Sequence, residues 1–157
     1  MGQRSLPVLC WRWRNIMKIS VMAVGKIKSR HIKALADDYA SRLSRYILAE
    51  ISVVRNDAKA LEKIAPSDFV IVLDERGKEM TSKNLAEFLT GHQARGTKNM
   101  VIFIGGPDGT DEQLKMRANF ILSLSNMTLP HELAQAVLLE QLYRACSINR
   151  GEPYHRE

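Results

Sequence analysis

The sequence predicts an α/β protein whose single parallel-rich sheet is covered by helices on both faces. From Met17 onward, short apolar runs alternate with segments of helical spacing. Two of the runs, Phe69–Leu73 and Met100–Ile104, are continuously apolar, which is typical of strands covered on both faces. Regular alternation of strand and helix favours parallel strands joined by helical crossovers.

The first half of the chain contributes two further strands and two helices. A short apolar strand is expected over Lys18–Val24. The helix expected over Ser29–Leu43 has its apolar residues at helical spacing. A second strand over Tyr46–Val54 leads to a short helix over Asp57–Ile64, which Pro66 would stop.

The second half continues the alternation. A helix is expected over Thr81–Ala94, where a hydroxyl at either of its first two positions can cap it. A short helix over Thr110–Met116 begins with acidic residues, which suit a helix N-terminus. A fifth strand is expected over Phe120–Leu124, and Pro130 fits the first turn of a last helix that reaches Ile148.

Composition indicates an ordinary globular protein. The chain has 157 residues, of which 45% are hydrophobic and 25% charged, as expected for one domain with a sizeable core. No apolar stretch approaches the ~20 residues of a membrane helix. Two cysteines without metal spacing are too few for a disulfide framework and favour a reduced, cytoplasmic setting.

The net charge of +6 is weaker support for a nucleic-acid partner than it first suggests. Three of the 23 basic residues lie in residues 1–16, which contain no acid, so the remainder carries +3. We interpret residues 1–16 as a non-native or disordered extension, with a functional arm or a targeting signal as alternatives. Residues 17–157 are expected to form a single domain.

The last helix is apolar on more than one face. Its apolar residues, from Leu133 to Cys146, cover more than the single stripe of an ordinary surface helix. The extra face needs a partner. The helix is either buried deep in its own protomer or packs both on the sheet and on a second copy, giving a two-fold dimer, which we favour.

Three loops that follow apolar runs predict a ligand pocket made largely of backbone. They are the turn Leu73–Lys78, the glycine loop Gly105–Gly109 and the polar kink Leu124–His131. Ligands of open α/β sheets bind at the carboxyl ends of strands. Read singly, each has a plainer interpretation: a charged surface turn, a tight strand-to-helix turn and a helix cap at Thr128 or its neighbour. The glycine loop matches neither a dinucleotide fingerprint nor a P-loop.

The C-terminal tail mixes aromatic, imidazole and guanidinium groups. It is either disordered, as terminal tails often are, or an arm that folds over a substrate. In the second case Tyr154 and His155 could stack on a base while Arg150 and Arg156 contact phosphate. His31 and His92 are expected to be solvated, whereas His131 beside the kink is a better candidate for a polar role.

Several enzyme classes lack the residues that they require. The sequence has no Ser-His-Asp order, no paired histidine ligands and no paired carboxylates of defined spacing. Hydrolase and metalloenzyme functions are therefore disfavoured, and no metal site is predicted.

Several motifs appear in a fixed order along most of the chain. These are Phe103–Gly109, Met127–His131, Leu138–Ala145 and Pro153–Arg156, together with Ala23–Lys26. Together they resemble the ribosomal large subunit methyltransferase H family, in the SPOUT superfamily of knotted methyltransferases. The likeness covers Met17 to Glu157. Residues before Met17 have no counterpart, and residues 55–68 are shorter than is usual in the family.

The resemblance implies a SPOUT-type α/β fold with a C-terminal trefoil knot, a homodimer and S-adenosylmethionine as cofactor. The implied reaction is methylation at N3 of a pseudouridine in helix 69 of 23S rRNA, on the assembled 70S ribosome. The family's cofactor-binding positions carry over onto Leu73, Gly105, Leu124, Ser125, Asn126, Met127, Thr128 and Leu129.

For catalysis, Arg144 could stabilise the anion that develops as N3 loses its proton. His155, or else His131, could accept that proton, while Tyr154 could stack on the nucleobase. Two alternatives stay open: a non-catalytic ribosome-binding protein that retains the cofactor pocket, and a small-molecule methyltransferase.

Overall fold

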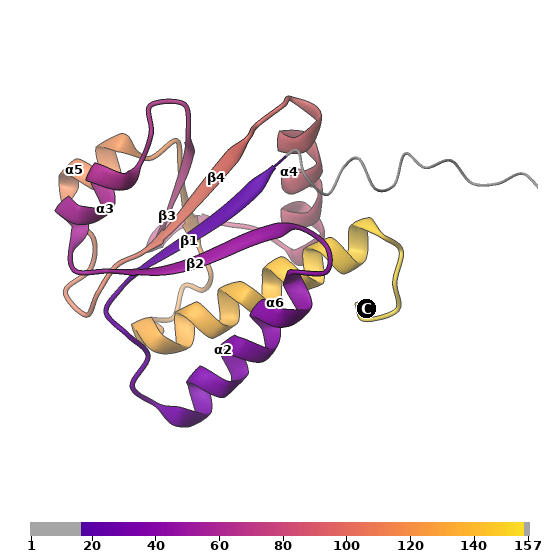
Figure 1. The fold of residues 1–157 in the computed structure, drawn as a ribbon, viewed down its shortest axis with the longest axis horizontal. Helices are drawn as coiled ribbons and strands as arrows, with labels where there is room; N and C mark the ends of the chain where they lie inside the picture. Colours follow the sequence, from indigo (N-terminus) through magenta and orange to yellow (C-terminus); the bar gives the residue numbers. More distant parts are fainter. Residues whose placement is uncertain (1–16, 156–157) are drawn as a thin grey trace, which may run out of the picture.

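The computed structural model describes residues 17–155, whose course is drawn in Figure 1. The interpretation of residues 1–16 as an extension and the suggested role of Arg156 therefore lie outside the described residues. Within the described part, no helix is both long and apolar enough to span a membrane.

The core of the fold is a five-stranded sheet in which all neighbours run parallel. Its order is β2-β1-β4-β3-β5, so β4 lies at the centre between β1 and β3, and β2 and β5 lie at the edges. The parallel sheet is confirmed. The strands are β1 (Lys18–Val24), β2 (Leu48–Val54), β3 (Phe69–Glu79), β4 (Asn99–Ile104) and β5 (Phe120–Ser123).

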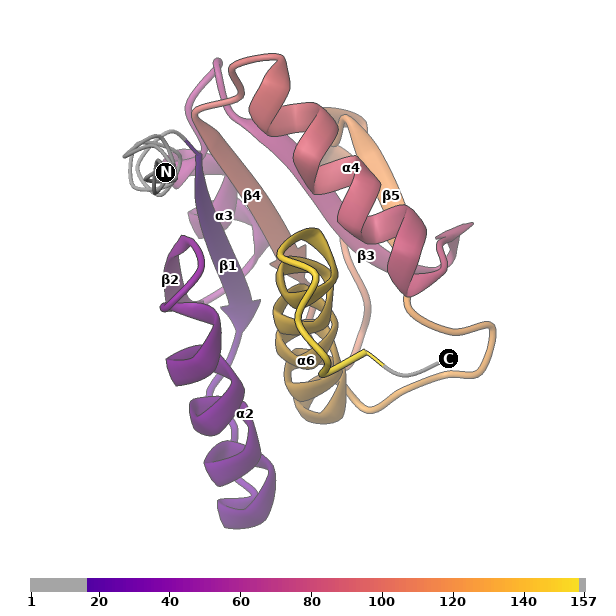
Figure 2. The same cartoon turned by 90° about the vertical axis from the view of Figure 1, so that its right-hand side faces the viewer.

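Helices cover both faces of this sheet, as predicted. On one face α6 lies between α2 and α4, while α3 and α5 cover the other (Figures 1 and 2). The helices are α2 (Arg30–Leu43), α3 (Asp57–Lys63), α4 (Ser82–Ala94), α5 (Glu112–Arg117) and α6 (His131–Asn149). Most predicted bounds agree to within one or two residues.

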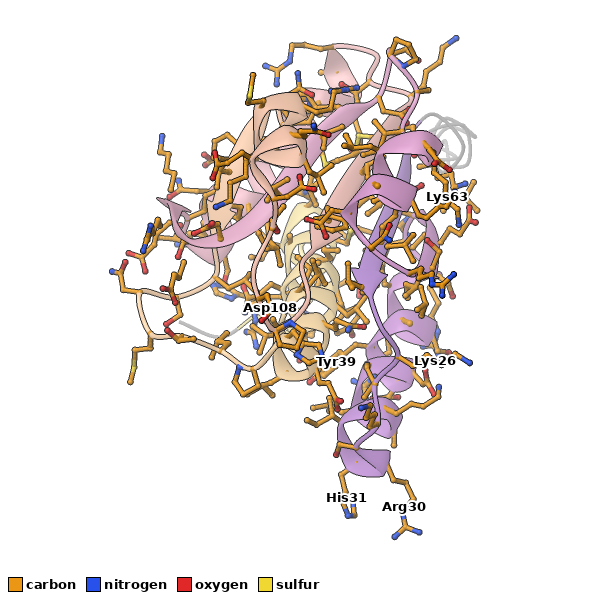
Figure 3. All side chains as sticks on the ribbon, turned by 90° about the vertical axis from the view of Figure 1, so that its left-hand side faces the viewer. Lys26, Arg30, His31, Tyr39, Lys63 and Asp108 are labelled. Atoms are coloured by element: carbon orange, nitrogen blue, oxygen red, sulfur yellow. The ribbon has the colours of Figure 1, made fainter. Side chains whose placement is uncertain are left out.

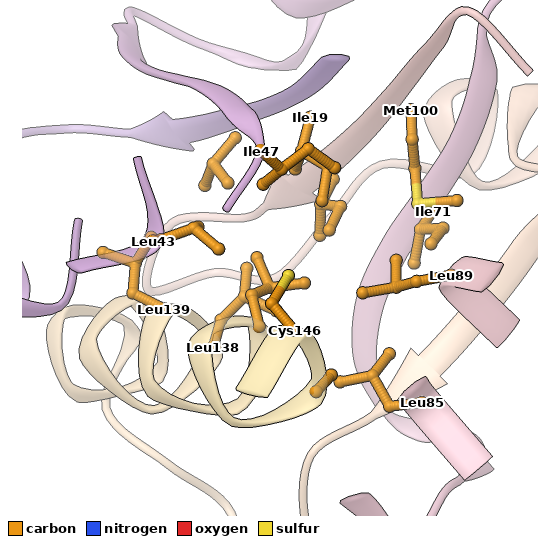
Figure 4. Packing of buried hydrophobic residues seen from close by; sticks show 14 of the residues in the cluster. Ile19, Leu43, Ile47, Ile71, Leu85, Leu89, Met100, Leu138, Leu139 and Cys146 are labelled. Carbon is orange, nitrogen blue, oxygen red and sulfur yellow. The ribbon is translucent and has the colours of Figure 1, made fainter. Parts of the chain in front are cut away.

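Two apolar cores follow from the two covered faces. The larger joins β1, β3 and β4 to the three long helices, with Leu138 and Leu142 of α6 fully buried at its centre; Figure 4 shows this packing. The smaller core, under α3 and α5, is built around Phe103 and Leu114. Alternate residues of the central strands thus supply both cores, which explains their continuous apolar runs.

The third strand differs from its prediction in a way that shapes the site. It does not end at Leu73 but resumes after a short excursion, residues 74–77, and continues to Glu79. Both Leu73 and Lys78 pair with Leu122 of β5, so the excursion is bulged out of the ladder. A Cβ at Gly77 would lie 2.7 Å from the backbone oxygen of Ile121, so glycine is needed where the chain rejoins the sheet.

One histidine prediction is wrong. His31 is exposed as expected, but His92 near the end of α4 is only 5% exposed. Its ring contacts those of Phe69 and Phe88, and its Nδ1 is 3.0 Å from the hydroxyl of Thr97. Charged neighbours in the sequence suggested a solvated position, but the aromatic contacts come from β3 and from one turn earlier in α4.

Candidate cofactor pocket and tyrosine cluster

A cavity of about 700 Å³ opens where β3, β4 and β5 send out their loops. This volume is in the range of sites for small-molecule ligands. Its walls come from the three predicted loops together with Lys115 of α5 and Ala134 of α6. The lining residues are Leu73, Asp74, Glu75, Arg76, Ile104, Gly105, Gly106, Pro107, Asp108, Gly109, Thr110, Lys115, Leu124, Ser125, Met127, Thr128, Leu129, Pro130, His131 and Ala134.

The glycine loop is packed tightly against itself. A Cβ at Gly105 would lie 2.6 Å from the Thr110 hydroxyl and 2.9 Å from the carbonyl oxygen of Gly109. Gly109 adopts a positive φ of 83° and donates a hydrogen bond of 3.0 Å from its N–H to the carbonyl of Gly106. The loop therefore needs glycine to close, and it presents backbone to the cavity.

The kink after β5 is held by its own polar groups. The Ser123 hydroxyl donates to the carbonyl of Ser125, and the Met127 N–H donates to the Ser125 hydroxyl, both at 2.9 Å. Thr128 does not cap α6, contrary to the plainer interpretation of this segment. Pro130 occupies the cap position without a side-chain bond, and the Thr128 hydroxyl instead donates to the Glu75 carboxylate across the cavity mouth.

Charges at the rim are arranged in pairs. Lys115 lies 3.0 Å from the Asp74 carboxylate, which also accepts the Arg76 N–H at 2.9 Å. That backbone hydrogen bond, helped by Lys115, lowers the pKa of Asp74, while the pKa of Lys115 is raised by its bond to Asp74. Both groups therefore stay charged at neutral pH, and they link the β3 excursion to α5.

The cavity brings together most of the residues predicted to bind a cofactor. Seven of them line it, together with His131, whereas Asn126 is exposed and does not. Their role in binding remains a prediction. The lining residues among the eight are Leu73, Gly105, Leu124, Ser125, Met127, Thr128 and Leu129.

The other candidate residues lie at a second place on α6, in a group that we call the tyrosine cluster. It consists of Tyr39, Tyr46, Tyr143 and Tyr154, which are all the tyrosines of the chain. The ring of Tyr143 is 6.1 Å from that of Tyr39, 5.7 Å from that of Tyr46 and 4.6 Å from that of Tyr154, centre to centre. Glu152 and Tyr154 of the tail contact Tyr46, Tyr39 of α2, and Glu140 and Tyr143 of α6, so this part of the tail is folded back.

Arg144 is bound into this cluster. Its guanidinium donates two hydrogen bonds to Glu140 and lies 4.9 Å from the centre of the Tyr154 ring. The Tyr154 hydroxyl shares a 3.2 Å hydrogen bond with Tyr39 and donates to Glu140 at 3.1 Å. Burial, followed by these bonds, raises the pKa of Tyr154. At neutral pH its phenol therefore donates a proton in a hydrogen bond and does not act as a base.

The pocket and the tyrosine cluster do not meet within this chain. Ala134 lines the pocket and Arg144 lies ten residues further along the same helix, which corresponds to about 15 Å of helix. His155 is partly buried beside the cluster, and its Nδ1 is buried with no hydrogen-bond partner. Of the four residues with predicted catalytic roles, the structure places His131 at the pocket and Arg144, Tyr154 and His155 away from it.

Some residues of the site were missed in the sequence. Glu140 could have been recognised, because it lies four residues before Arg144 on a predicted helix, a spacing that favours ion pairs. Lys115 with Asp74, and Tyr39 with Tyr154, are brought together only by tertiary structure. Among residues 17–155, no group of His, Cys, Asp and Glu is suited to hold a metal ion.

A five-stranded parallel sheet whose strand-end loops form a pocket is typical of α/β proteins that bind a ligand. Comparison with known proteins identifies the family within this class. Residues 17–155 match the family described as "Predicted SPOUT methyltransferase". A putative methylase family protein from Neisseria gonorrhoeae has a similar fold, with a TM-score of 0.56 at 13% identity over 99% of this chain and 91% of that one.

Curated relatives narrow the family further. The chain is 41% identical to "Ribosomal RNA large subunit methyltransferase H" of Syntrophotalea carbinolica, over 88% of this chain and 99% of the relative. It is 39% identical to the protein of the same name from Carboxydothermus hydrogenoformans, over 89% and 100% of the two chains. The chain therefore belongs to the ribosomal RNA large subunit methyltransferase H family of SPOUT methyltransferases.

Proposed function

We propose that the protein uses S-adenosylmethionine to methylate N3 of a pseudouridine in helix 69 of 23S rRNA. The observation that carries the proposal is the convergence of three loops, from β3, β4 and β5, on one cavity of about 700 Å³. These are the loops that the family resemblance assigns to the cofactor. The names of the curated relatives support large-subunit rRNA as the substrate class.

The residues at the cavity fit this cofactor. Glycines at 105 and 106 keep backbone accessible, while Leu124 and Leu129 provide apolar walls for an adenine ring. The cofactor carries both a carboxylate and an ammonium group, and the rim offers Lys115 and Asp74 as partners of opposite sign. Both signs of charge on one rim suit a zwitterionic ligand.

The chemistry divides between the two regions of α6. When bound, S-adenosylmethionine supplies an electrophilic methyl group on a sulfonium. The pocket loops would fix the direction of that group, and alignment of donor and acceptor can contribute up to ~7–11 kcal/mol to catalysis. Arg144 would stabilise the N3 anion. His155, or His131 in its place, would accept the N3 proton. Tyr154, which stays protonated, would hold the nucleobase.

A homodimer would join the two regions. A groove between α2 and α6, with a volume of about 180 Å³, is lined by apolar residues that include Leu35, Leu133 and Val137. Leu35 is 44% exposed. We propose that a second copy covers this groove, so that the tyrosine cluster of one protomer faces the pocket of its partner. The proposal includes the family's C-terminal trefoil knot, the assembled 70S ribosome as substrate and hence a cytoplasmic location.

The decisive experiment measures methyl transfer to defined acceptors. Purified protein is incubated with labelled S-adenosylmethionine and either 70S ribosomes, free 23S rRNA or no RNA, and helix 69 nucleosides are analysed by mass spectrometry. We expect one N3-methylpseudouridine, formed on ribosomes and much less on free rRNA. Cofactor binding without transfer would point to a non-catalytic ribosome-binding protein. Turnover without RNA would point to a small-molecule substrate.

A further inference from the structure

A run of basic side chains lies between the end of β1 and the first turn of α2. We call it the basic segment: Lys26, Lys28, Arg30, His31 and Lys33, all of them exposed. Residues 1–36 contain no acidic residue at all. Figure 3 shows Arg30 and His31 projecting from the start of α2, with Lys26 near the same end of the molecule and Lys63 well away from it.

Most of this charge is not neutralised within the protomer. Lys33 pairs with Asp37 at 2.7 Å, and α2 has no acidic residue in its first turn. Among the described residues, no carboxylate lies within ion-pair distance of Lys26, Lys28 or Arg30. The charge of Lys28 also helps to lower the pKa of Glu132, but none of the three cations forms an ion pair with a described residue, so they can bind an external anion.

Two contacts fix the basic segment beside the cofactor pocket. The Glu132 carboxylate accepts the N–H groups of Lys28 and Ser29, each at 3.0 Å, and these bonds lower its pKa, so it stays ionised. Glu132 directly follows Pro130 and His131, which line the pocket. Just before the segment, Val24 packs closely on the glycine loop, because a Cβ added to Gly106 would lie only 3.3 Å from the Val24 Cγ1.

We propose that the basic segment binds the phosphodiester backbone of the rRNA that flanks the target nucleotide. This inference rests on the proposed function, and it adds the surface that grips the substrate. Unpaired lysine and arginine side chains are the usual partners of RNA phosphates. Such contacts fix the position of the RNA without reading its sequence. A segment pinned to the start of α6 would thus align the RNA with the pocket.

The test is a triple variant, Lys26→Gln, Lys28→Gln and Arg30→Gln. Its matched control removes three exposed cations, Lys63→Gln, Arg95→Gln and Lys98→Gln, at the ends of α3 and α4 and before β4, at the opposite end of the strands. For each protein we would measure the Kd for 70S ribosomes at several salt concentrations, the KM and kcat of methyl transfer, and the Kd for S-adenosylmethionine.

We expect the triple variant to bind ribosomes at least tenfold more weakly and to raise KM in proportion. Its kcat and cofactor affinity should stay unchanged. The slope of log affinity against log salt should fall by about two to three, because three phosphate contacts are lost. The control should change little, and a version with Lys26→Arg and Lys28→Arg should keep wild-type affinity.

Two results would overturn the inference: equal weakening in the triple variant and its control, or wild-type ribosome affinity in the triple variant. Failure of the proposed function would look different, because the wild-type protein itself would then transfer no methyl group to ribosomes. The binding measurements do not depend on that transfer, so they test the basic segment in either case.

Discussion

The pocket at the start of α6 and the tyrosine cluster further along it are built from different parts of the chain's structure. At its start, the pocket is made of loops whose shape depends on backbone, with glycines at 77 and 105 that leave no room for a Cβ. Further along, the tyrosine cluster is made of side chains from α2, the turn after it, α6 and the tail, joined by ring contacts and hydrogen bonds. The pocket depends on positions where a side chain would not fit, whereas the tyrosine cluster depends on contacts between side chains.

This difference suggests a division of labour. Backbone recognition suits a cofactor that is the same in every turnover. Side chains that hold one another, such as Arg144 on Glu140, suit chemistry that demands a defined charge at one point. Changes in the two regions should therefore affect different measurable quantities.

The largest effect is expected from removing residues 151–157. The deletion takes away Tyr154, which completes the tyrosine cluster, and the proposed base His155, so methyl transfer to ribosomes should fall by ~10³-fold or more. The Kd for S-adenosylmethionine, measured by calorimetry, should stay within twofold of wild type. Unchanged turnover would remove the tail from the mechanism.

The reverse pattern is expected for Gly105→Val. Its side chain would collide with Thr110 and the Gly109 carbonyl, so the loop must distort, and cofactor affinity should drop about 100-fold, or ~2.7 kcal/mol. Gly91→Ala is the matched control, because its Cβ would find nothing nearer than 3.8 Å. Wild-type affinity in Gly105→Val would refute the assignment of this pocket to the cofactor.

A smaller change should follow Arg144→Lys. Lysine keeps the charge but cannot reproduce the two hydrogen bonds to Glu140 or the stacking on Tyr154. We expect kcat to fall about tenfold with cofactor affinity unchanged. Arg117→Lys, at the end of α5, serves as a control, and a loss of cofactor binding in Arg144→Lys would contradict the separation of the two regions.

The smallest effect concerns stability rather than activity, at a position outside both regions. Burial first, and then Arg95, lowers the pKa of His92, so the folded state favours the neutral ring. Its contribution to stability is therefore present above the unfolded pKa of about 6.5 and is lost as the pH falls below it. Melting temperatures from pH 8 to pH 5 should decline by a few degrees more for wild type than for His92→Gln. Parallel declines would show that His92 is not the group responsible.

The contrast between the two regions also explains what the sequence could predict. Apart from the end of β3, strands, helices and the pocket loops were predicted to within a few residues, because apolar periodicity and glycine positions are local signals. The tyrosine cluster was not predicted as a unit, since Tyr39 and Tyr154 are 115 residues apart. Likewise, His92 was predicted to be solvated because its sequence neighbours are polar, whereas its burial comes from Phe69 on another element.

The excursion in β3 has a consequence for how this fold can change. Both Leu73 and Lys78 are anchored to the same residue of β5, so the intervening residues form a closed side loop on an otherwise continuous strand. Insertions or replacements between Asp74 and Arg76 should alter the charged rim of the cavity while the sheet keeps its register. Replacing this loop could therefore change which ligand the cavity prefers while the rest of the fold stays the same.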